Sequence, residues 1–264
     1  MAQYFLSVAA VFKNESHILA EWIEHYLKEG VDHFYLIDNG STDDWASALM
    51  PYSGVITLGH DDRKHFQNEL YNGYVLPLKS QMDWLLVCDL DEFAYTKNGT
   101  IREFIKGIPE KVNGLRMPWV QFGSSGHIKQ PKSVVDGFRM RRKYDPMVKI
   151  ETKQIVRMND IDHLGIHEHA ICGWIILDGC GKSVENICVA DMDEDYIKNA
   201  ELLMNHYQVQ SKDWFTRVKM TRGDAVHEMN IRDEAYFNNY DFNDVIDDTL
   251  AVKRGFPARL MGVR

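Results

Sequence analysis

Two aspartates, Asp89 and Asp91, stand one residue apart directly after the apolar run Leu85 to Cys88. A short continuous apolar run without Gly or Pro is typical of a strand that is buried on both faces of a parallel sheet. Open α/β sheets bind ligands at the carboxyl ends of such strands, which is where these carboxylates fall. Carboxylate oxygens suit a hard divalent cation, and such a cation suits a diphosphate. The pattern therefore predicts a metal-dependent enzyme that handles a nucleotide diphosphate.

The Asp-x-Asp spacing alone is weak, because it also occurs at Asp160/Asp162, Asp191/Asp193 and Asp193/Asp195. Any one such triplet is more often a solvated turn than a ligand site. The run from Asp191 to Asp195 follows an apolar stretch and is the main competitor, although Tyr196 stands where an EF-hand loop needs Gly. We prefer Asp89/Asp91 because of its place in the chain order.

Composition restricts the class of protein. The 264 residues suffice for one large α/β domain, and a net charge of −9 argues against a nucleic-acid-binding surface. No stretch approaches 18 apolar residues, so no transmembrane helix is expected, and the N-terminus has no basic region typical of a signal peptide. With no C-x-x-C pair, the four cysteines are expected to be reduced thiols of a soluble, cytoplasmic chain.

The first third of the chain alternates between strand and helix patterns. Strands are predicted at 5–12, 33–37, 55–58 and 84–88, and helices at 18–27, 45–49 and 66–79. This alternation implies a parallel, doubly wound sheet with helices on both faces. Asn14, Asp38 and Asp89 then follow strand ends at one edge, so three sequence-distant polar sites should converge on one crevice.

After Phe93 the pattern changes. Thr100 and Glu103 form a capping box for a helix at 101–106, and strands are predicted at 114–120, 134–140 and 150–157. Two further helices, 213–222 ending at Gly223 and 243–254, make a helical C-terminal part. His163, His167 and His169 cluster around Glu168, where ligand chemistry competes with ordinary surface or core histidines.

Several segments occur in a fixed order along the chain: Val11-Phe12-Lys13-Asn14-Glu15, Glu21-Trp22-x-x-His25-Tyr26, Asp38-Asn39-Gly40-Ser41-Thr42-Asp43, Asp89-Leu90-Asp91-Glu92-Phe93, Trp119-x-x-Phe122-Gly123-Ser124-x-Gly126-His127, Lys153-x-Ile155-Val156-Arg157, Asn205-His206-Tyr207 and Lys219-x-x-Arg222-Gly223. In these segments the chain resembles family-92-type glycosyltransferases of the wider GT-A class. Each segment is loose alone, but their order is specific. Met158 stands where we expect Pro in relatives, which affects only a local turn.

The resemblance implies one GT-A domain, with a nucleotide-sugar-binding half (1–95), an acceptor and metal half (96–223) and C-terminal helices (224–264). Asp91 would ligate Mn²⁺ (or Mg²⁺) directly and so take part in catalysis, with Asp89 on ribose or on the metal through water. His167 is the first choice to complete the metal shell and His206 the second.

The resemblance also implies the donor contacts. Asp38 would accept the uracil N3–H, and Asn14 and Glu15 would frame the base or ribose. The segment that begins at Gln67 and contains Asn72, together with Leu90, completes the expected donor site.

The expected reaction is transfer of a sugar from a UDP-sugar to an acceptor hydroxyl of a glycan or glycoconjugate, with inversion. Inversion needs a general base, for which Glu168 is the candidate and Asp195 and Glu228 are alternatives. Two other classes stay open. A nucleotidyltransferase shares the sheet and the carboxylates, but usually needs a Gly-rich loop where Lys13 to Ser16 stands. A non-catalytic sugar-binding module would use aromatic side chains instead.

Overall fold

The structure, a computed structural model, describes residues 2–64, 66–173, 175–222 and 232–258. The first part of the chain contains β1 (Tyr4–Phe12), α1 (Ser16–Lys28), β2 (His33–Asp38), α2 (Trp45–Leu49), β3 (Ile56–His60), α3 (Gln67–Leu70), β4 (Met82–Val87) and β5 (Glu92–Thr96). The helical turns of α3 continue as a π-helical stretch, Tyr71–Val75, and a 3-10 stretch, Leu76–Gln81.

The middle of the chain is richer in strands. It contains α4 (Ile101–Lys106), β6 (Gly114–Gln121), α5 (Val134–Gly137), β7 (Met140–Arg141), β8 (Val148–Arg157), β9 (Ile161–His163), β10 (Ala170–Ile171), β11 (Ile176–Asp178), β12 (Ser183–Val184) and β13 (Val189–Met192). The last part contains α6 (Glu194–Asn199), β14 (Leu202–His206), α7 (Lys212–Trp214), α8 (Met220–Arg222), α9 (Glu234–Tyr240), β15 (Val245–Ile246) and α10 (Thr249–Lys253), with a π-helical stretch, Phe215–Lys219, joining α7 to α8.

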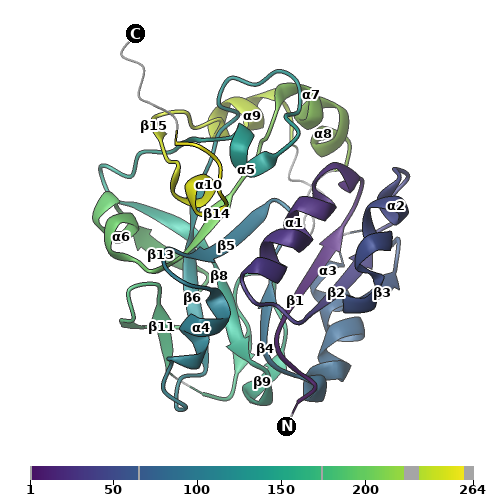
Figure 1. The fold of residues 1–264 in the computed structure, drawn as a ribbon, viewed down its shortest axis with the longest axis vertical. Coiled ribbons are helices and arrows are strands. Elements are labelled where there is room, and N and C mark those ends of the chain that lie inside the picture. The colour runs from purple at the N-terminus through teal and green to yellow at the C-terminus, as the bar shows by residue number, and fades with distance from the viewer. Residues whose placement is uncertain (1, 65, 174, 223–231, 259–264) are drawn as a thin grey trace.

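One large sheet forms the centre of the molecule, with strand order β12-β11-β6-β8-β4-β1-β2-β3 (Figure 1). The four strands β3, β2, β1 and β4 are parallel, as the alternating pattern predicts. The long strand β8 then runs antiparallel to both β4 and β6. The predicted α/β class, with a Rossmann-like parallel half, is confirmed.

Helices cover both faces of the parallel half. Trp22 and Tyr26 of α1 are fully buried on one face, and Leu70 and Tyr71 are fully buried on the other. The strands between them read as continuous apolar runs because both of their faces are covered. At about 25 cal/mol per Å² of buried apolar surface, these two layers are the main source of the fold's stability.

The strand predicted at 134–140 is wrong, because residues 134–137 form the helical turn α5 and only Met140–Arg141 extend as β7. The Ser133 side chain caps this turn by accepting from the backbone N–H of Asp136. Glu21 of α1 accepts from the backbone N–H groups of Val134 and Val135, at 2.7 and 3.3 Å. A helix start needs such acceptors, and this one comes from a distant helix that local sequence does not reveal.

The helix predicted at 243–254 is confirmed only in its second half. Val245–Ile246 form β15, which pairs antiparallel with β7, and the helix α10 covers only Thr249–Lys253. The Arg141 guanidinium fixes this arrangement, since its Nε donates to Asp247 at 2.8 Å. A tertiary ion pair thus overrides the helical period. The predicted end of the preceding helix, Gly223, lies outside the described residues.

Candidate functional site

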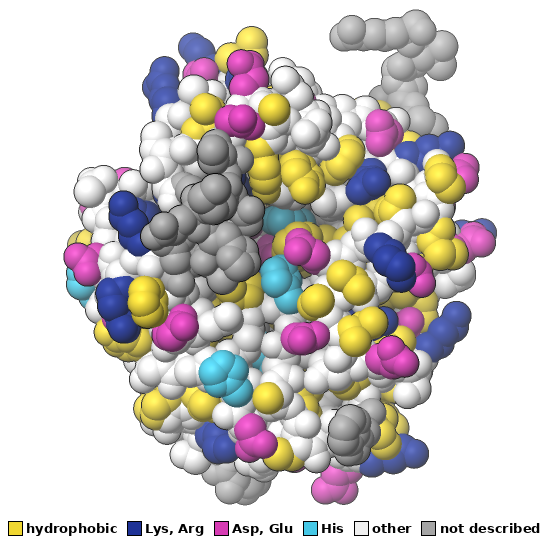
Figure 2. Space-filling view, turned by 180° about the vertical axis from the view of Figure 1, so that it is seen from behind, with side chains coloured by type: hydrophobic (Ala, Val, Ile, Leu, Met, Phe, Trp, Pro, Cys, Tyr) yellow, Lys and Arg dark blue, Asp and Glu magenta, His cyan; other side chains and the backbone are white. Residues whose placement is uncertain are grey.

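A pocket of about 750 Å³ opens where strands β1 and β4 end, bounded by β8, β14 and the helical segment 215–222. Asp89 and Asp91 line it, whereas the competing triplets do not. Asp193 instead caps α6, accepting from the backbone N–H of Tyr196 at 2.7 Å. Figure 2 shows the face opposite to that of Figure 1, where histidine and acidic side chains gather in a central hollow.

Two side chains of helix α1 stabilise the Asp-x-Asp turn by hydrogen bonds to its backbone. The Trp22 indole N–H donates to the backbone carbonyls of Asp89 and Glu92, at 3.2 and 3.1 Å. The Tyr26 hydroxyl donates to the Glu92 carbonyl and accepts from the Ala94 backbone N–H. The Trp22, Tyr26, Glu92 and Ala94 groups are buried and Asp89 is half-buried, so these hydrogen bonds fix the backbone shape of the turn.

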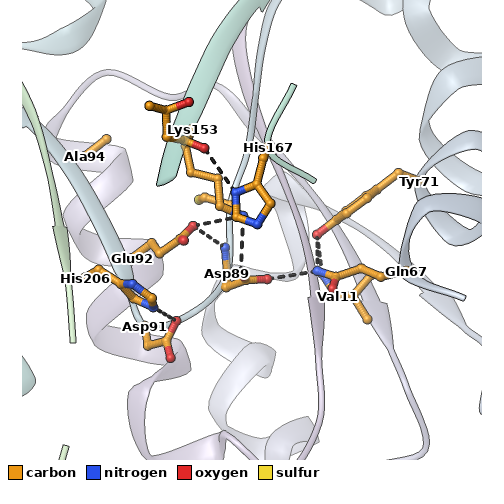
Figure 3. Close-up of polar contacts among 12 residues, drawn as sticks. Val11, Gln67, Tyr71, Asp89, Asp91, Glu92, Ala94, Lys153, His167 and His206 are labelled. Atoms are coloured by element: carbon orange, nitrogen blue, oxygen red, sulfur yellow. Dashed lines mark hydrogen bonds and ion pairs between the residues drawn. The ribbon is translucent and has the colours of Figure 1, made fainter. Parts of the chain in front are cut away.

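Asp89 is bound on both sides within the pocket wall (Figure 3). Its carboxylate accepts from Gln67 Nε2 at 2.9 Å and lies 3.3 Å from the Lys153 ammonium, which is also 3.4 Å from Glu92. Burial is the largest influence and raises the pKa of Asp89, but Lys153, the Gln67 hydrogen bond and His167 together hold this pKa below the ordinary value. Burial likewise lowers the pKa of Lys153, yet the carboxylates of Asp89 and Glu92 raise it. Asp89 is therefore ionised and Lys153 charged at neutral pH.

Asp91 faces two cationic or potentially cationic groups from late in the chain. One carboxylate oxygen lies 3.5 Å from His206 Nε2, and the other lies 2.7 Å from the Lys219 ammonium. His206 reaches this position because β14 pairs with β5, which puts His206 opposite Glu92. Burial raises the pKa of Asp91, but Lys219 and His206 hold it well below its ordinary value. Burial lowers the pKa of His206, which keeps its imidazole neutral.

Asp91 and His206 fit two ligands of a divalent cation. They meet at the pocket wall, where the Nε2 of His206 faces the Asp91 carboxylate, and among the described residues the buried Nδ1 of His206 has no hydrogen-bond partner. A carboxylate and a neutral imidazole are acceptable donors to Mn²⁺, and a diphosphate brings further oxygens. In the described ranges, no group of three or more His, Cys, Asp or Glu is arranged to hold a metal ion. The predicted set of Asp89, Asp91 and His167 is therefore not preassembled.

Among the described residues, neither the predicted histidine nor the predicted base forms a hydrogen bond or ion pair with Asp91. His167 lines the pocket and its Nδ1 lies 3.1 Å from the Thr152 carbonyl; burial, then Lys153, lowers its pKa to about 4. Glu168 is exposed and does not line the pocket, and neither does Asp195. The alternative Glu228 lies outside the described residues.

Of the residues predicted to contact the nucleoside, Glu15 lines the pocket, whereas Asn14 and Asp38 do not. Glu15 lies 3.0 Å from the Arg222 guanidinium. Asp38 is buried. Its carboxylate accepts from the Ser41 backbone N–H at 2.8 Å and lies 2.7 Å from His60 Nδ1. Asn14 accepts from the Thr42 backbone N–H.

Of the remaining predicted donor residues, Gln67 lines the pocket, whereas Asn72 and Leu90 do not. Gln67 holds Asp89. Asn72 instead ties two segments together, donating to the Leu164 carbonyl and accepting from the Leu164 backbone N–H. Leu90 is buried in the core between the two aspartates.

Sequence reasoning missed the roles of four charged residues: Glu151, Lys219 and Arg222, which line the pocket, and Lys153, which is buried against Asp89. Lys153 sits in a strand pattern that ends near the aspartates, but a lone Lys in a strand is ordinarily read as exposed. The only signal for Lys219 and Arg222 was their place in the C-terminal segment Lys219-x-x-Arg222-Gly223. Nothing in the local sequence distinguishes Glu151.

A comparison with known protein families identifies the family of this chain. The model of glycosyltransferase family 92 matches residues 3–244. The chain belongs to glycosyltransferase family 92. The expected resemblance is thereby confirmed, and the Asp-x-Asp turn and the pocket lie within the matched region.

Curated members of family 92 include one from Oryza sativa subsp. japonica, 24% identical over 52% of this chain, and one from Ricinus communis, 22% identical over 62% of it. The matched regions are 24% and 32% of those proteins, so this family 92 chain spans about a quarter to a third of their length.

Two solved structures show a similarity that is too low to assign a ligand to this family 92 chain. S. aureus TarS in complex with UDP is 16% identical, with a TM-score of 0.39, covering 60% of this chain and 49% of that one. Mycobacterium tuberculosis glucosyl-3-phosphoglycerate synthase in complex with Mn²⁺ and UDP-glucose is 16% identical, with a TM-score of 0.28, covering 44% of each chain. Among the described residues, no helix has the length and apolar character to cross a bilayer.

Proposed function

We propose that this chain transfers a sugar from a UDP-sugar to an acceptor hydroxyl, with a divalent cation bound at Asp91. The observation that carries the proposal is the position of the Asp-x-Asp turn. Within a family 92 match, it opens into a large pocket that also contains Lys219 and Arg222. A carboxylate pair with nearby fixed cations suits a diphosphate leaving group.

The chain's own cations act on that leaving group. Lys219 is buried against Asp91, and Arg222 is held by Glu15 on the side of the pocket nearest β1. Positive charges fixed by such pairs need no reorganisation when negative charge develops on the departing diphosphate. A bound Mn²⁺ or Mg²⁺ would add Lewis-acid stabilisation of the same oxygens. Asp91 and His206 would hold it, and Lys219 would share the Asp91 carboxylate.

The nucleoside would lie along β1 and β2. Glu15 and Gln67 line this end of the pocket, and Asp38 lies buried behind it. For Asp38 to accept the uracil N3–H, the base must take the place of the His60 ring, whose side chain is 66% exposed. An exposed ring can be moved at small cost, which keeps this part of the proposal open to test.

We further propose that the transfer inverts the anomeric carbon. In a single displacement the acceptor attacks opposite the diphosphate, so a base must remove the acceptor proton on that side. In this proposal the leaving group lies at Asp91 and Lys219, and the acceptor lies along the part of the wall that β8 supplies through Ile150 and Glu151. NMR of the product from an α-linked donor should show a β linkage, and an α-linked product would reject inversion.

The testing experiment is UDP release from a panel of UDP-sugars, with Mn²⁺, Mg²⁺ or EDTA. A ligand at 100 times its Kd stabilises the folded state by about 2.7 kcal/mol, so thermal shifts identify the donor first. Cation-dependent UDP release supports the proposal. Pyrophosphate release from a nucleoside triphosphate would favour a nucleotidyltransferase, and glycan binding without release of either would favour a sugar-binding module.

A further inference from the structure

The carboxylates that line the pocket in the described residues are Glu15, Asp89, Asp91 and Glu151. Three of them are neutralised by a partner, since Arg222, Lys153 and Lys219 lie 3.0, 3.3 and 2.7 Å from Glu15, Asp89 and Asp91. Glu151 differs. Across the part of the chain that the structure describes, its carboxylate has no ion pair or hydrogen bond. Among the described residues, Glu151 is thus the acidic side chain of the pocket wall that no cation neutralises.

The strand β8 aims Glu151 at the reacting region. Side chains two residues apart lie on the same face of a strand, so Glu151 shares a face with Lys153. Lys153 Nζ contacts Asp89 at the tip of the Asp-x-Asp turn. The Cα of Glu151 therefore lies about 7 Å from that of Lys153 along the strand, at a rise of about 3.4 Å per residue, and Glu151 lines the pocket. It is exposed, whereas Lys153 is fully buried, so Glu151 stands toward the open mouth of the pocket.

The aromatic and imidazole side chains that line the pocket near Glu151 suit the binding of a sugar that carries the acceptor hydroxyl. Trp119 lines the pocket with its ring centroid 4.1 Å from that of His206 and 5.2 Å from that of His167. His167 is fixed to the carbonyl of Thr152, the residue next to Glu151. Aromatic and imidazole side chains thus border the space between Glu151 and Asp91.

We propose that Glu151 is the general base that deprotonates the acceptor hydroxyl. This inference rests on the proposed function. As the acceptor oxygen bonds to the anomeric carbon, the bond from that carbon to the diphosphate oxygen breaks, and its electron pair leaves with UDP. The acceptor O–H proton passes to the Glu151 carboxylate, so one bond to carbon forms, one breaks and the proton is accounted for.

The test compares Glu151→Gln with Glu168→Gln. Both replace an exposed glutamate by its neutral isostere, but only Glu151 lines the pocket. The readouts are UDP release from the donor found active with the wild-type chain, and the thermal shift produced by UDP with Mn²⁺. We expect E151Q to lose about 100-fold or more in UDP release and to keep the wild-type thermal shift. E168Q should keep the wild-type rate.

Near-normal release by E151Q, or an equal loss in E168Q, overturns the assignment while leaving the glycosyl-transfer proposal standing. Loss of the UDP thermal shift in E151Q also overturns it, because a base acts on the acceptor and not on nucleotide binding. A wild-type chain that releases no UDP from any UDP-sugar sinks the proposed function itself. A further arm adds azide to Glu151→Ala. An anionic nucleophile has no proton to lose, so restored UDP release supports the base role, and no restoration counts against it.

Discussion

The carboxylate of Asp91 and the ammonium of Lys219 lie 2.7 Å apart, although 128 residues separate them in the chain. Both side chains are buried, at 6% and 5% exposure, so the pair is desolvated. A buried pair of this kind contributes little net stability, but either member alone is costly. The proposed function gives the pair a role in the pocket wall, which is to fix charge beside the diphosphate of the proposed donor.

Asp91→Asn should abolish cation-dependent donor binding. The substitution keeps the size of the side chain but removes the charge that a hard cation requires. We expect UDP release to fall on the order of 100-fold and the Mn²⁺-dependent part of the UDP thermal shift to disappear. Asp193→Asn is the matched control, since Asn caps a helix as well as Asp does and α6 should stay intact. A folded D91N chain with unchanged Mn²⁺ dependence would remove Asp91 from the site.

Lys153→Met should destabilise the fold. Lys153 is fully buried between Asp89 and Glu92, and its removal leaves the Asp89 carboxylate without its ammonium partner and the buried Glu92, whose pKa burial raises, without its nearest cation. We expect a loss of about 3–5 kcal/mol in urea unfolding. Lys149→Met on the same strand is the control, because Lys149 and Asp191 are 73% and 59% exposed and their pair contributes about 0–1 kcal/mol. Equal effects of the two substitutions would contradict the buried-pair account.

Arg222→Met should weaken nucleotide binding more than it changes stability. Arg222 lines the pocket, and its guanidinium donates to the Lys13 carbonyl and to Glu15. Loss of one charge-assisted contact to the diphosphate predicts about a tenfold rise in the Kd for UDP, measured by calorimetry. Arg217→Met, an exposed position on the same helical segment, should leave the Kd unchanged. An R222M chain that binds UDP as tightly as the wild type would exclude Arg222 from the donor site.

Stability should fall as the pH falls below about 6.5. Burial is the largest cause that lowers the pKa of His25, and of His169, to about 3 in the folded chain. The unfolded state therefore binds more protons between the unfolded pKa of about 6.5 and the folded pKa, so protonation favours unfolding throughout that window. Each histidine should contribute about 1.4 kcal/mol per pH unit well inside it.

The measurement is urea unfolding of the wild type, His25→Gln and His163→Gln at several pH values between about 7.5 and 5. His25→Gln should lower the slope of stability against pH by one histidine's share, whatever its effect at neutral pH. His163→Gln, at an exposed position, is the control for replacing a histidine by glutamine. A wild-type chain equally stable across this range would refute the titration of buried histidines.

Local signals were enough for much of the fold. The strands β1, β2 and β4 were predictable because both faces of the parallel half are covered, which makes their sequences apolar throughout. The helix α4 was predictable because its capping box, Thr100 with Glu103, lies within one turn of sequence. The helix α5 was not predictable, because its free N–H groups are satisfied by Glu21, over 100 residues away.

The site was predictable only where it depends on strand ends. Asp89 and Asp91 follow directly from β4, so their place at the sheet edge can be inferred from chain order. The strand β14 was not predicted, because Leu202–His206 is short and owes its position to pairing with β5 and β6. The contact between Asp91 and His206 depends on that pairing. Burial of Lys153 likewise depends on two carboxylates from another strand end, a relationship that no local window contains.

The late strand β14 also affects how the protein is made. In space it lies between β5 and β6, but it follows both in the chain, and Lys219 and Arg222 come later still. Because the ribosome supplies residues from the N-terminus, the strands that end at Asp38 and Asp89 can pair while His206 has yet to emerge. A growing chain therefore passes through a stage with an ordered sheet but without the groups that complete the Asp91 end of the pocket. The proposed transfer therefore requires that synthesis has passed Lys219 and Arg222.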